Sequence, residues 1–145
     1  MARALALAAE AGADGDVPVG AVVVDAAGAV IGEGRNTRER DGDPTGHAEV
    51  LALRAAAVAK GEWRLEGCTL VVTLEPCPMC AGAALLARVP RIALGAWDPK
   101  MGACGSVWDV VRDRRSTHRV EVLGGVRESE CGLLLTDFFD GRRSG

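Results

Sequence analysis

The sequence contains no tyrosine, and only 3% of its 145 residues are aromatic. Its interior must therefore be built mainly from Ala, Val and Leu. The sequence also lacks any apolar run close to the roughly 20 residues that a membrane-spanning helix requires. With 48% hydrophobic residues, the chain is long enough for one domain with a proper core and too short for two ordinary ones. We expect a single domain over residues 1–145.

Lysine is nearly absent, since only Lys60 and Lys100 contribute to the 17 basic residues, and the net charge is −3. This total gives no sign of a nucleic-acid-binding protein. Arginines do gather over residues 112–119 and again at Arg142 and Arg143. By themselves these clusters are typical of a solvated, arginine-rich surface. They become informative only if they border an active site.

The five cysteines are an odd number, which argues against the disulfide framework of a secreted protein. The first ten residues have no clear signal-peptide cleavage region and predict an amphipathic helix instead. We therefore expect a cytoplasmic protein without membrane partners. Cys68 and Cys131 are interpreted as small buried hydrophobic residues. The role of Cys104, in a glycine-rich loop, is left open.

The apolar pattern and the turn residues predict alternating strands and helices. Strands are expected over about 19–24, 29–34, 68–74, 91–96 and 119–123, and helices over about 2–12, 47–60, 78–88 and 128–140. The turn at residues 25–28 predicts a hairpin between the first two strands, and residues 35–46 are expected to form a polar loop. This alternation indicates an α/β layer fold in which at least part of the sheet is parallel.

The most informative residues form two separated groups, with His47 and Glu49 in the first and Cys77 and Cys80 in the second. One imidazole and two thiolates make a three-ligand zinc set, which leaves one tetrahedral position open for water. Hydrolysis at such a site also requires a proton carrier that is not a ligand, and Glu49 can fill that role. The combination favours a catalytic zinc site over a structural one.

The spacing of these residues places a condition on the fold. Cys77 and Cys80 are three residues apart at a helix start marked by Pro78, so both sulfurs can face one ion. His47 and Glu49 would point about 200° apart inside a helix, whereas at a helix start both can reach inward. We therefore expect two helix N-termini to meet at one ion.

Three other interpretations remain open for these residues. A structural zinc site would need a fourth ligand, such as His118 or another cysteine. A Cys-x-x-Cys pair alone could be a redox motif. Taken singly, His47 and Glu49 could be a core histidine and a surface carboxylate. The joint occurrence of both groups favours zinc-dependent hydrolysis over all three.

The His-x-Glu and Pro-Cys-x-x-Cys groups resemble the signature of the zinc-dependent cytidine and deoxycytidylate deaminase superfamily. Within it, the sequence is similar to the bacterial tRNA-specific adenosine deaminases over about residues 2–143. The similar segments are Val17–Ala21, Gly32–Asn36, Asp43–Thr45, Thr73–Ala83, Gly95–Ser106, His118–Glu121 and Asp137–Phe139.

This resemblance implies a cytidine-deaminase-like three-layer α/β/α fold with a five-stranded mixed sheet, and a homodimer. It implies one Zn²⁺ per chain on His47, Cys77 and Cys80, with Glu49 as the catalytic residue. It further implies substrate contacts, which would fall at Asn36, Glu75, Pro76, Asp98 and Lys100. In this scheme Asn36 contacts a flipped base, backbone near Glu75 helps to hold the water or purine, and the loop over residues 98–106 borders the RNA.

The implied reaction is hydrolytic deamination of adenosine to inosine at the wobble position (34) of a tRNA anticodon. The main alternative is a free-base or nucleoside deaminase acting on guanine, cytosine or cytidine through the same zinc chemistry. A zinc-stabilised binding module without catalysis is a third possibility. The zinc motif is common to the two enzyme hypotheses, so the choice between them depends on Asn36 and on the loop over residues 98–106.

Overall fold

The computed structural model describes residues 1–144. Its elements are α1 (Ala2–Ala13), β1 (Gly20–Val24), β2 (Val30–Arg35), α2 (Arg38–Asp41), α3 (Ala48–Lys60), β3 (Thr69–Leu74), α4 (Pro78–Leu86), β4 (Arg91–Ala96), β5 (Glu121–Leu123) and α5 (Glu128–Ser144). Each strand and long helix predicted from the sequence is present at or near its predicted position.

The strands form one mixed sheet in the order β2-β1-β3-β4-β5. Strand β1 pairs antiparallel with β2 and β3, whereas β3, β4 and β5 run parallel. The predicted hairpin between β1 and β2 is confirmed, and its turn is fixed by Asp25, whose Oδ1 accepts the amides of Ala27 and Ala29 at 3.0 and 2.9 Å. The predicted α/β class with a five-stranded mixed sheet is therefore correct.

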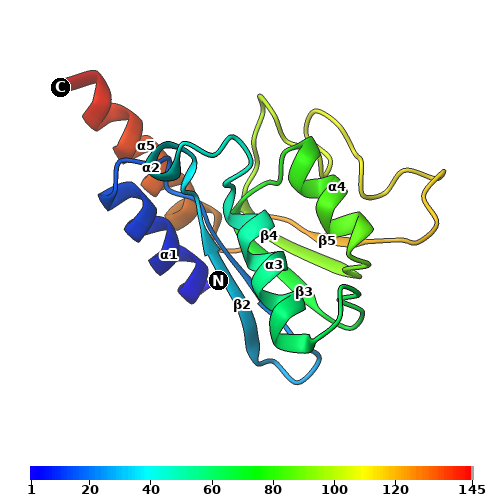
Figure 1. The fold of residues 1–145 in the computed structure, drawn as a ribbon. Coiled ribbons are helices and arrows are strands. Elements are labelled where there is room, and N and C mark those ends of the chain that lie inside the picture. The colour runs from blue at the N-terminus through cyan, green and yellow to red at the C-terminus, as the bar shows by residue number, and fades with distance from the viewer. Residues whose placement is uncertain (145) are drawn as a thin grey trace.

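Helices cover both faces of this sheet (Figure 1). Helices α1 and α5 contact each other and pack on one face, and α3 packs on the other face beside α4. The approach of α3 to β2 is close because β2 carries glycine at Gly32 and Gly34. A Cβ atom at Gly34 would lie 2.7 Å from the backbone nitrogen of Ala52 in α3. This packing fixes the height of α3, and thus of its first residues, above the sheet.

Small aliphatic residues build the core, as the scarcity of aromatic residues predicts. Leu70, Ile92 and Leu94 from the central strands are fully buried, and Ala52 and Ala56 form much of the inner face of α3. Burial is also the outcome for Cys68, Cys131 and Cys104. The open question about Cys104 is answered in part, because its thiol belongs to the interior.

The structure adds one helical turn that the sequence did not predict. Helix α2 lies inside the expected polar loop, and the carboxylate of Asp16 accepts the backbone amides of Glu39 and Arg40 at 2.7 and 3.1 Å. This fully buried carboxylate therefore holds α2 in place from a distant part of the chain. Among the described residues, no helix is long and apolar enough to cross a membrane.

Candidate active site

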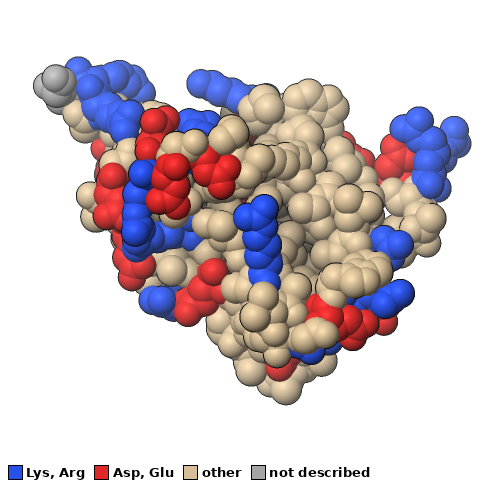
Figure 2. Space-filling view, in the orientation of Figure 1, with Lys and Arg blue, Asp and Glu red and all other residues tan. Residues whose placement is uncertain are grey.

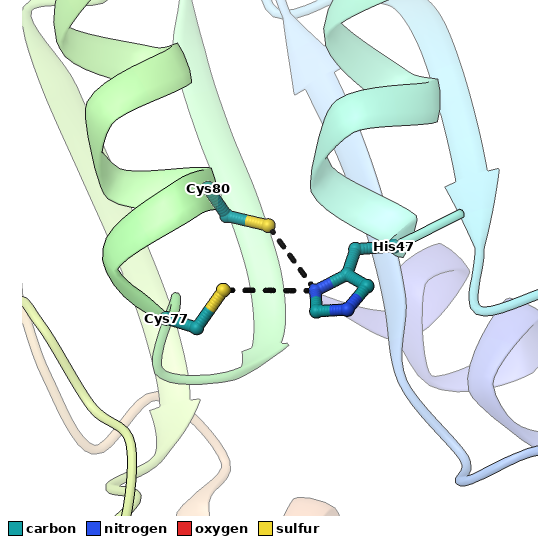
Figure 3. A group of neighbouring side chains, drawn as sticks. All are labelled: His47, Cys77 and Cys80. Atoms are coloured by element: carbon teal, nitrogen blue, oxygen red, sulfur yellow. Dashed lines mark hydrogen bonds between the residues drawn. The ribbon is translucent and has the colours of Figure 1, made fainter. Parts of the chain in front are cut away.

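Two helices begin at the same point between the sheet and its covering layer. His47 is the residue before α3, with an extended ψ of 147°, and Cys77 occupies the same position before α4, with ψ 173°. Pro78 is the first residue of α4, where its missing amide costs no hydrogen bond. Figure 3 shows the His47 ring facing both cysteine sulfurs across the gap between the two helix starts. The arrangement is the one that the sequence spacing required.

The donor atoms have the separations of a tetrahedral metal site. The Nδ1 atom of His47 lies 3.6 Å from Cys77 Sγ and 3.5 Å from Cys80 Sγ. With zinc–ligand distances of about 2.3 Å for sulfur and about 2.0–2.1 Å for nitrogen, a tetrahedral site separates nitrogen and sulfur by about 3.6 Å. Within the part of the chain that the structure describes, this group has no fourth member, so His118 is not part of it. The donor set fits one zinc ion with a position open for another ligand.

Glu49 lies beside this donor set and is almost completely buried. Its carboxyl group is hydrogen bonded with the thiol of Cys80. Burial raises the pKa of Glu49 to about 7, because the charged carboxylate loses its hydration. A carboxyl group in this setting can both accept and donate a proton near neutral pH.

The two thiols of the donor set differ in pKa. A hydrogen bond with Cys80 lowers the pKa of Cys77 to about 4, and contact with His47 acts in the same direction. The Cys77 contact and burial raise the pKa of Cys80. Hydrogen bonding to Cys77 also raises the pKa of His47. Cys77 is thus already set up as a thiolate, the form that binds a metal.

A pocket with a volume of about 270 Å³ opens beside these residues. It is lined by Val17, Val19, Asn36, Arg38, His47, Ala48, Glu49, Leu74, Glu75, Cys77, Asp98 and Met101. Most of the exposed wall surface is apolar, although half of these lining residues have polar or charged side chains that can hold a ligand in one orientation. Pockets for drug-sized ligands measure about 300–1,000 Å³, so this one suits a smaller ligand, such as a single base.

Two of the predicted substrate contacts, Asn36 and Asp98, line this pocket on different loops. The side chain of Asn36 donates to the carbonyl of Val17 at 3.1 Å and accepts the amide of Arg38 at 3.1 Å. Asp98 accepts the amides of Lys100 and Met101 at 2.9 and 3.3 Å, which closes a turn. Both residues therefore also determine the shape of the loops that border the pocket.

The other three predicted contacts have different positions. Glu75 lines the pocket but is only 2% exposed, and its carboxylate accepts backbone amides of a neighbouring loop. The side chain of Pro76 is fully buried, and its carbonyl accepts the amide of Ala103 at 2.8 Å. Lys100 is exposed on the turn that Asp98 closes, outside the pocket lining.

The pocket also includes residues that the sequence reasoning missed. Arg38 at the start of α2 and Met101 in the turn after Asp98 both line it. The only signal for Arg38 was its place two residues after Asn36, and Met101 lay inside a segment identified by resemblance alone. Neither residue belongs to a pattern that spacing can reveal.

The fold and the donor set define a zinc-dependent hydrolytic deaminase domain, and comparisons with known proteins agree. Residues 1–96 match the cytidine and deoxycytidylate deaminase zinc-binding region. A tRNA-specific adenosine deaminase of Bacillus subtilis is 47% identical over 139 residues, which cover 96% of this chain and 86% of that protein. The chain belongs to this deaminase family, on its tRNA-specific adenosine deaminase branch.

Two solved structures and one longer protein are also similar to this chain. A structure from work on A-to-I editing by tRNA:A34 deaminases superposes with a TM-score of 0.86 at 42% identity, covering 91% of this chain and 95% of that one. A guanine deaminase of Nitrosomonas europaea gives 0.79 at 25% identity, with 94% and 81% covered. A tRNA(Ile)-lysidine synthase of Deinococcus radiodurans is 54% identical over 96% of this chain. The chain spans only 24% of that relative's length.

Proposed function

We propose that this protein hydrolyses the adenosine at the wobble position (34) of a tRNA anticodon to inosine. The observation that carries the proposal is the placement of a buried carboxyl group, Glu49, against the His47, Cys77 and Cys80 donor set inside a base-sized pocket. The sequence similarity to tRNA-specific adenosine deaminases extends beyond that donor set to the loop at residues 98–106.

The reaction replaces the amino group on C6 of adenine with the oxygen of water and releases ammonia. A zinc ion on the three ligands supplies the Lewis acidity that makes water a nucleophile at neutral pH. Glu49 accepts the proton that this water loses. The same carboxyl group gives this proton to the ring nitrogen N1, then accepts the remaining proton of the added hydroxyl group and passes it to the departing amine, which leaves as ammonia. Its near-complete burial keeps bulk water from competing for these protons.

The pocket walls suit a base that has left its stack. Val17, Val19 and Met101 provide apolar surface for the ring, and Asn36 offers an amide that can pair with a base edge. An anticodon loop presents unpaired bases, so extruding one costs little stacking energy. Asp98 and Lys100 lie on the loop that would border the flanking nucleotides.

The alternative activity is deamination of a free base such as guanine. It is supported by the structural similarity to the Nitrosomonas europaea guanine deaminase, although the identity to the tRNA:A34 deaminase structure is higher. A zinc-stabilised binding module without catalysis would not need a buried carboxyl group, Glu49, beside the zinc ligands. The two enzyme hypotheses share their zinc chemistry and differ in the size of the substrate.

One incubation series separates these functions. Zinc-loaded protein is incubated with an anticodon stem-loop carrying adenosine at the wobble position, and in parallel with free adenine, guanine and cytidine. Nucleoside mass spectrometry measures inosine, and an enzymatic assay measures ammonia. We expect inosine in the stem-loop and no ammonia from the free bases. Ammonia from guanine with an unchanged stem-loop would favour the alternative.

We also propose a homodimer in the cytoplasm, formed through the outer face of α4. This helix contains no charged residue, and its Met79 and Leu86 side chains are 37% and 69% exposed. Figure 2 shows an uncharged surface over α4, whereas charged side chains gather over α1, α2 and the end of α5. Apolar surface of this kind is usual where a second subunit packs. Arginines near the resulting groove would contact RNA phosphates.

A further inference from the structure

Glu75 has a buried carboxylate that makes no ion pair among the described residues. It lies two residues before Cys77, a member of the donor set. Its two oxygens instead accept backbone amides from one loop. Oε1 accepts the amide of Asp98 at 2.9 Å, and Oε2 accepts those of Cys104 and Ser106 at 3.0 and 3.1 Å. The side chain is therefore bound to both ends of the loop at residues 98–106, which contributes Asp98 and Met101 to the pocket.

The backbone around Glu75 strengthens the same connection. The amide of Glu75 donates to the carbonyl of Ala96 at 2.8 Å, and the carbonyl of Pro76 accepts the amide of Ala103 at 2.8 Å. The loop is thus fixed directly to the segment that carries Cys77. A shift of the loop relative to the zinc ligands requires these hydrogen bonds to break.

The loop approaches the carboxylate so closely that only glycine fits at one position. A Cβ atom at Gly102 would overlap the carboxylate of Glu75 and the hydroxyl of Ser106. That hydroxyl in turn donates to the carbonyl of Asp98 at 2.7 Å, which closes the loop on itself. The loop therefore wraps around the Glu75 carboxylate, and its shape depends on the hydrogen bonds that this carboxylate accepts.

We infer that Glu75 is a positioning residue, which holds the 98–106 loop at a fixed distance from the zinc ligands. Because both of its oxygens already accept amides, it acts on the substrate through this loop and not by direct contact. This inference deepens the proposed function. It rests on that function only where it assumes that the 98–106 loop contacts the RNA substrate. A carboxylate suits this position because three amide donors converge on it and both of its oxygens are acceptors.

The first test replaces Glu75 with its amide. In Glu75→Gln, one oxygen becomes an NH₂ group that faces an N–H donor, so one side of the loop loses its acceptor. Hydrogen exchange measured by NMR on the free protein should accelerate at least about tenfold at the amides that lose their acceptor, among Asp98, Cys104 and Ser106. The zinc content should remain one per chain. The KM for the anticodon stem-loop should rise about tenfold, with a smaller change in kcat.

A second variant displaces the loop and leaves the carboxylate intact. In Gly102→Ala the new methyl group pushes the loop away from Glu75, and we expect the same local exchange pattern and the same rise in KM. Gly132→Ala is the matched control, because a Cβ there has nothing within 4 Å. Asp16→Asn changes another buried carboxylate that accepts two backbone amides, and should leave exchange in the 98–106 loop unchanged.

Two results would overturn the inference. Wild-type exchange at all three amides in both Glu75→Gln and Gly102→Ala would show that the carboxylate does not hold the loop. Loss of zinc together with faster exchange throughout the chain would show that Glu75 supports the whole fold. The exchange measurement does not depend on activity, so it remains decisive even if the wild-type protein fails to deaminate the stem-loop and the proposed function falls.

Discussion

Glu49 is the residue whose chemistry the proposed reaction depends on most. It lies two residues after a zinc ligand, and its carboxyl group contacts the Cys80 thiol without being needed as a ligand. A group in this place can carry protons between water and substrate while the donor set stays complete. The proposed reaction thus assigns metal binding and proton transfer to different, neighbouring side chains.

Replacing Glu49 with glutamine tests this separation. The amide keeps the size of the side chain and loses the ability to carry a proton, so the single-turnover rate on the stem-loop should fall by about 10²–10⁴-fold. Zinc content, measured by plasma mass spectrometry, should stay at one per chain. Glu66→Gln is the control, because Glu66 is exposed and does not line the pocket, and this variant should keep the wild-type rate. A Glu49→Gln protein with wild-type turnover would refute the role of this residue.

The cysteines allow a matched test of the donor set. Cys80→Ala removes one of three ligands and should reduce zinc to well below one per chain, with loss of deamination. Cys68→Ala changes a cysteine that is equally buried but lies outside the set, and should retain the metal. Zinc measured per chain after dialysis compares the two proteins directly. Equal zinc in both would contradict the assignment.

At the scale of elements, the close packing of α3 on β2 sets the position of His47. Gly34 faces the first turns of α3, where a Cβ would meet backbone atoms and the side chain of Leu51 at 3.0 Å. Backbone cannot move aside as a flexible side chain can. The strand therefore controls where the helix start, and with it the imidazole, lies above the sheet.

Gly34→Ala should consequently disturb both stability and the site. Overpacking of this kind costs about 1–3 kcal/mol of unfolding free energy, which urea denaturation would measure. Because α3 must move outward, the affinity for zinc should fall as well. Gly132→Ala, with open space around it, should be neutral or slightly stabilising in its helix. Unchanged stability and zinc affinity in Gly34→Ala would argue against this view of the packing.

The sequence was most informative about elements with apolar patterns. The run Val19–Val24 and the turn at Asp25 were enough to predict the hairpin, and the ligand spacing predicted the meeting of two helix starts. Helix α2 was not predictable, because its residues have no apolar face and two of its amides are held by Asp16, 23 and 24 residues away along the chain. The amide contacts of Glu75 were hidden for the same reason, since their partners lie 23 to 31 residues further on.

At the scale of the whole molecule, a net charge of −3 must be reconciled with the proposed RNA substrate. Charged side chains are unevenly distributed, and α4 carries none. An uncharged face is suited to a second subunit, which would bring arginines of two chains around one groove. The total charge is then less important than its distribution around the paired molecule.

Leu86→Glu tests the proposed subunit contact. A carboxylate on the outer face of α4 should prevent association, because two charges would be buried without partners. Light scattering coupled to gel filtration should find a monomer, whereas the wild type and Leu133→Glu on α5 should be dimers. Leu133 is a fair control because its side chain is 58% exposed on a helix that packs on the opposite face of the sheet. A dimeric Leu86→Glu protein would place the contact elsewhere.

The most direct test of the account is an isotope measurement on the RNA. The zinc-loaded protein is incubated with an anticodon stem-loop in water labelled with the heavy oxygen isotope, and the RNA fragments are sequenced by mass spectrometry. We expect one labelled oxygen in place of the amino group, at the wobble adenosine alone. An unlabelled or unmodified wobble base, or label spread over other adenosines, would contradict it.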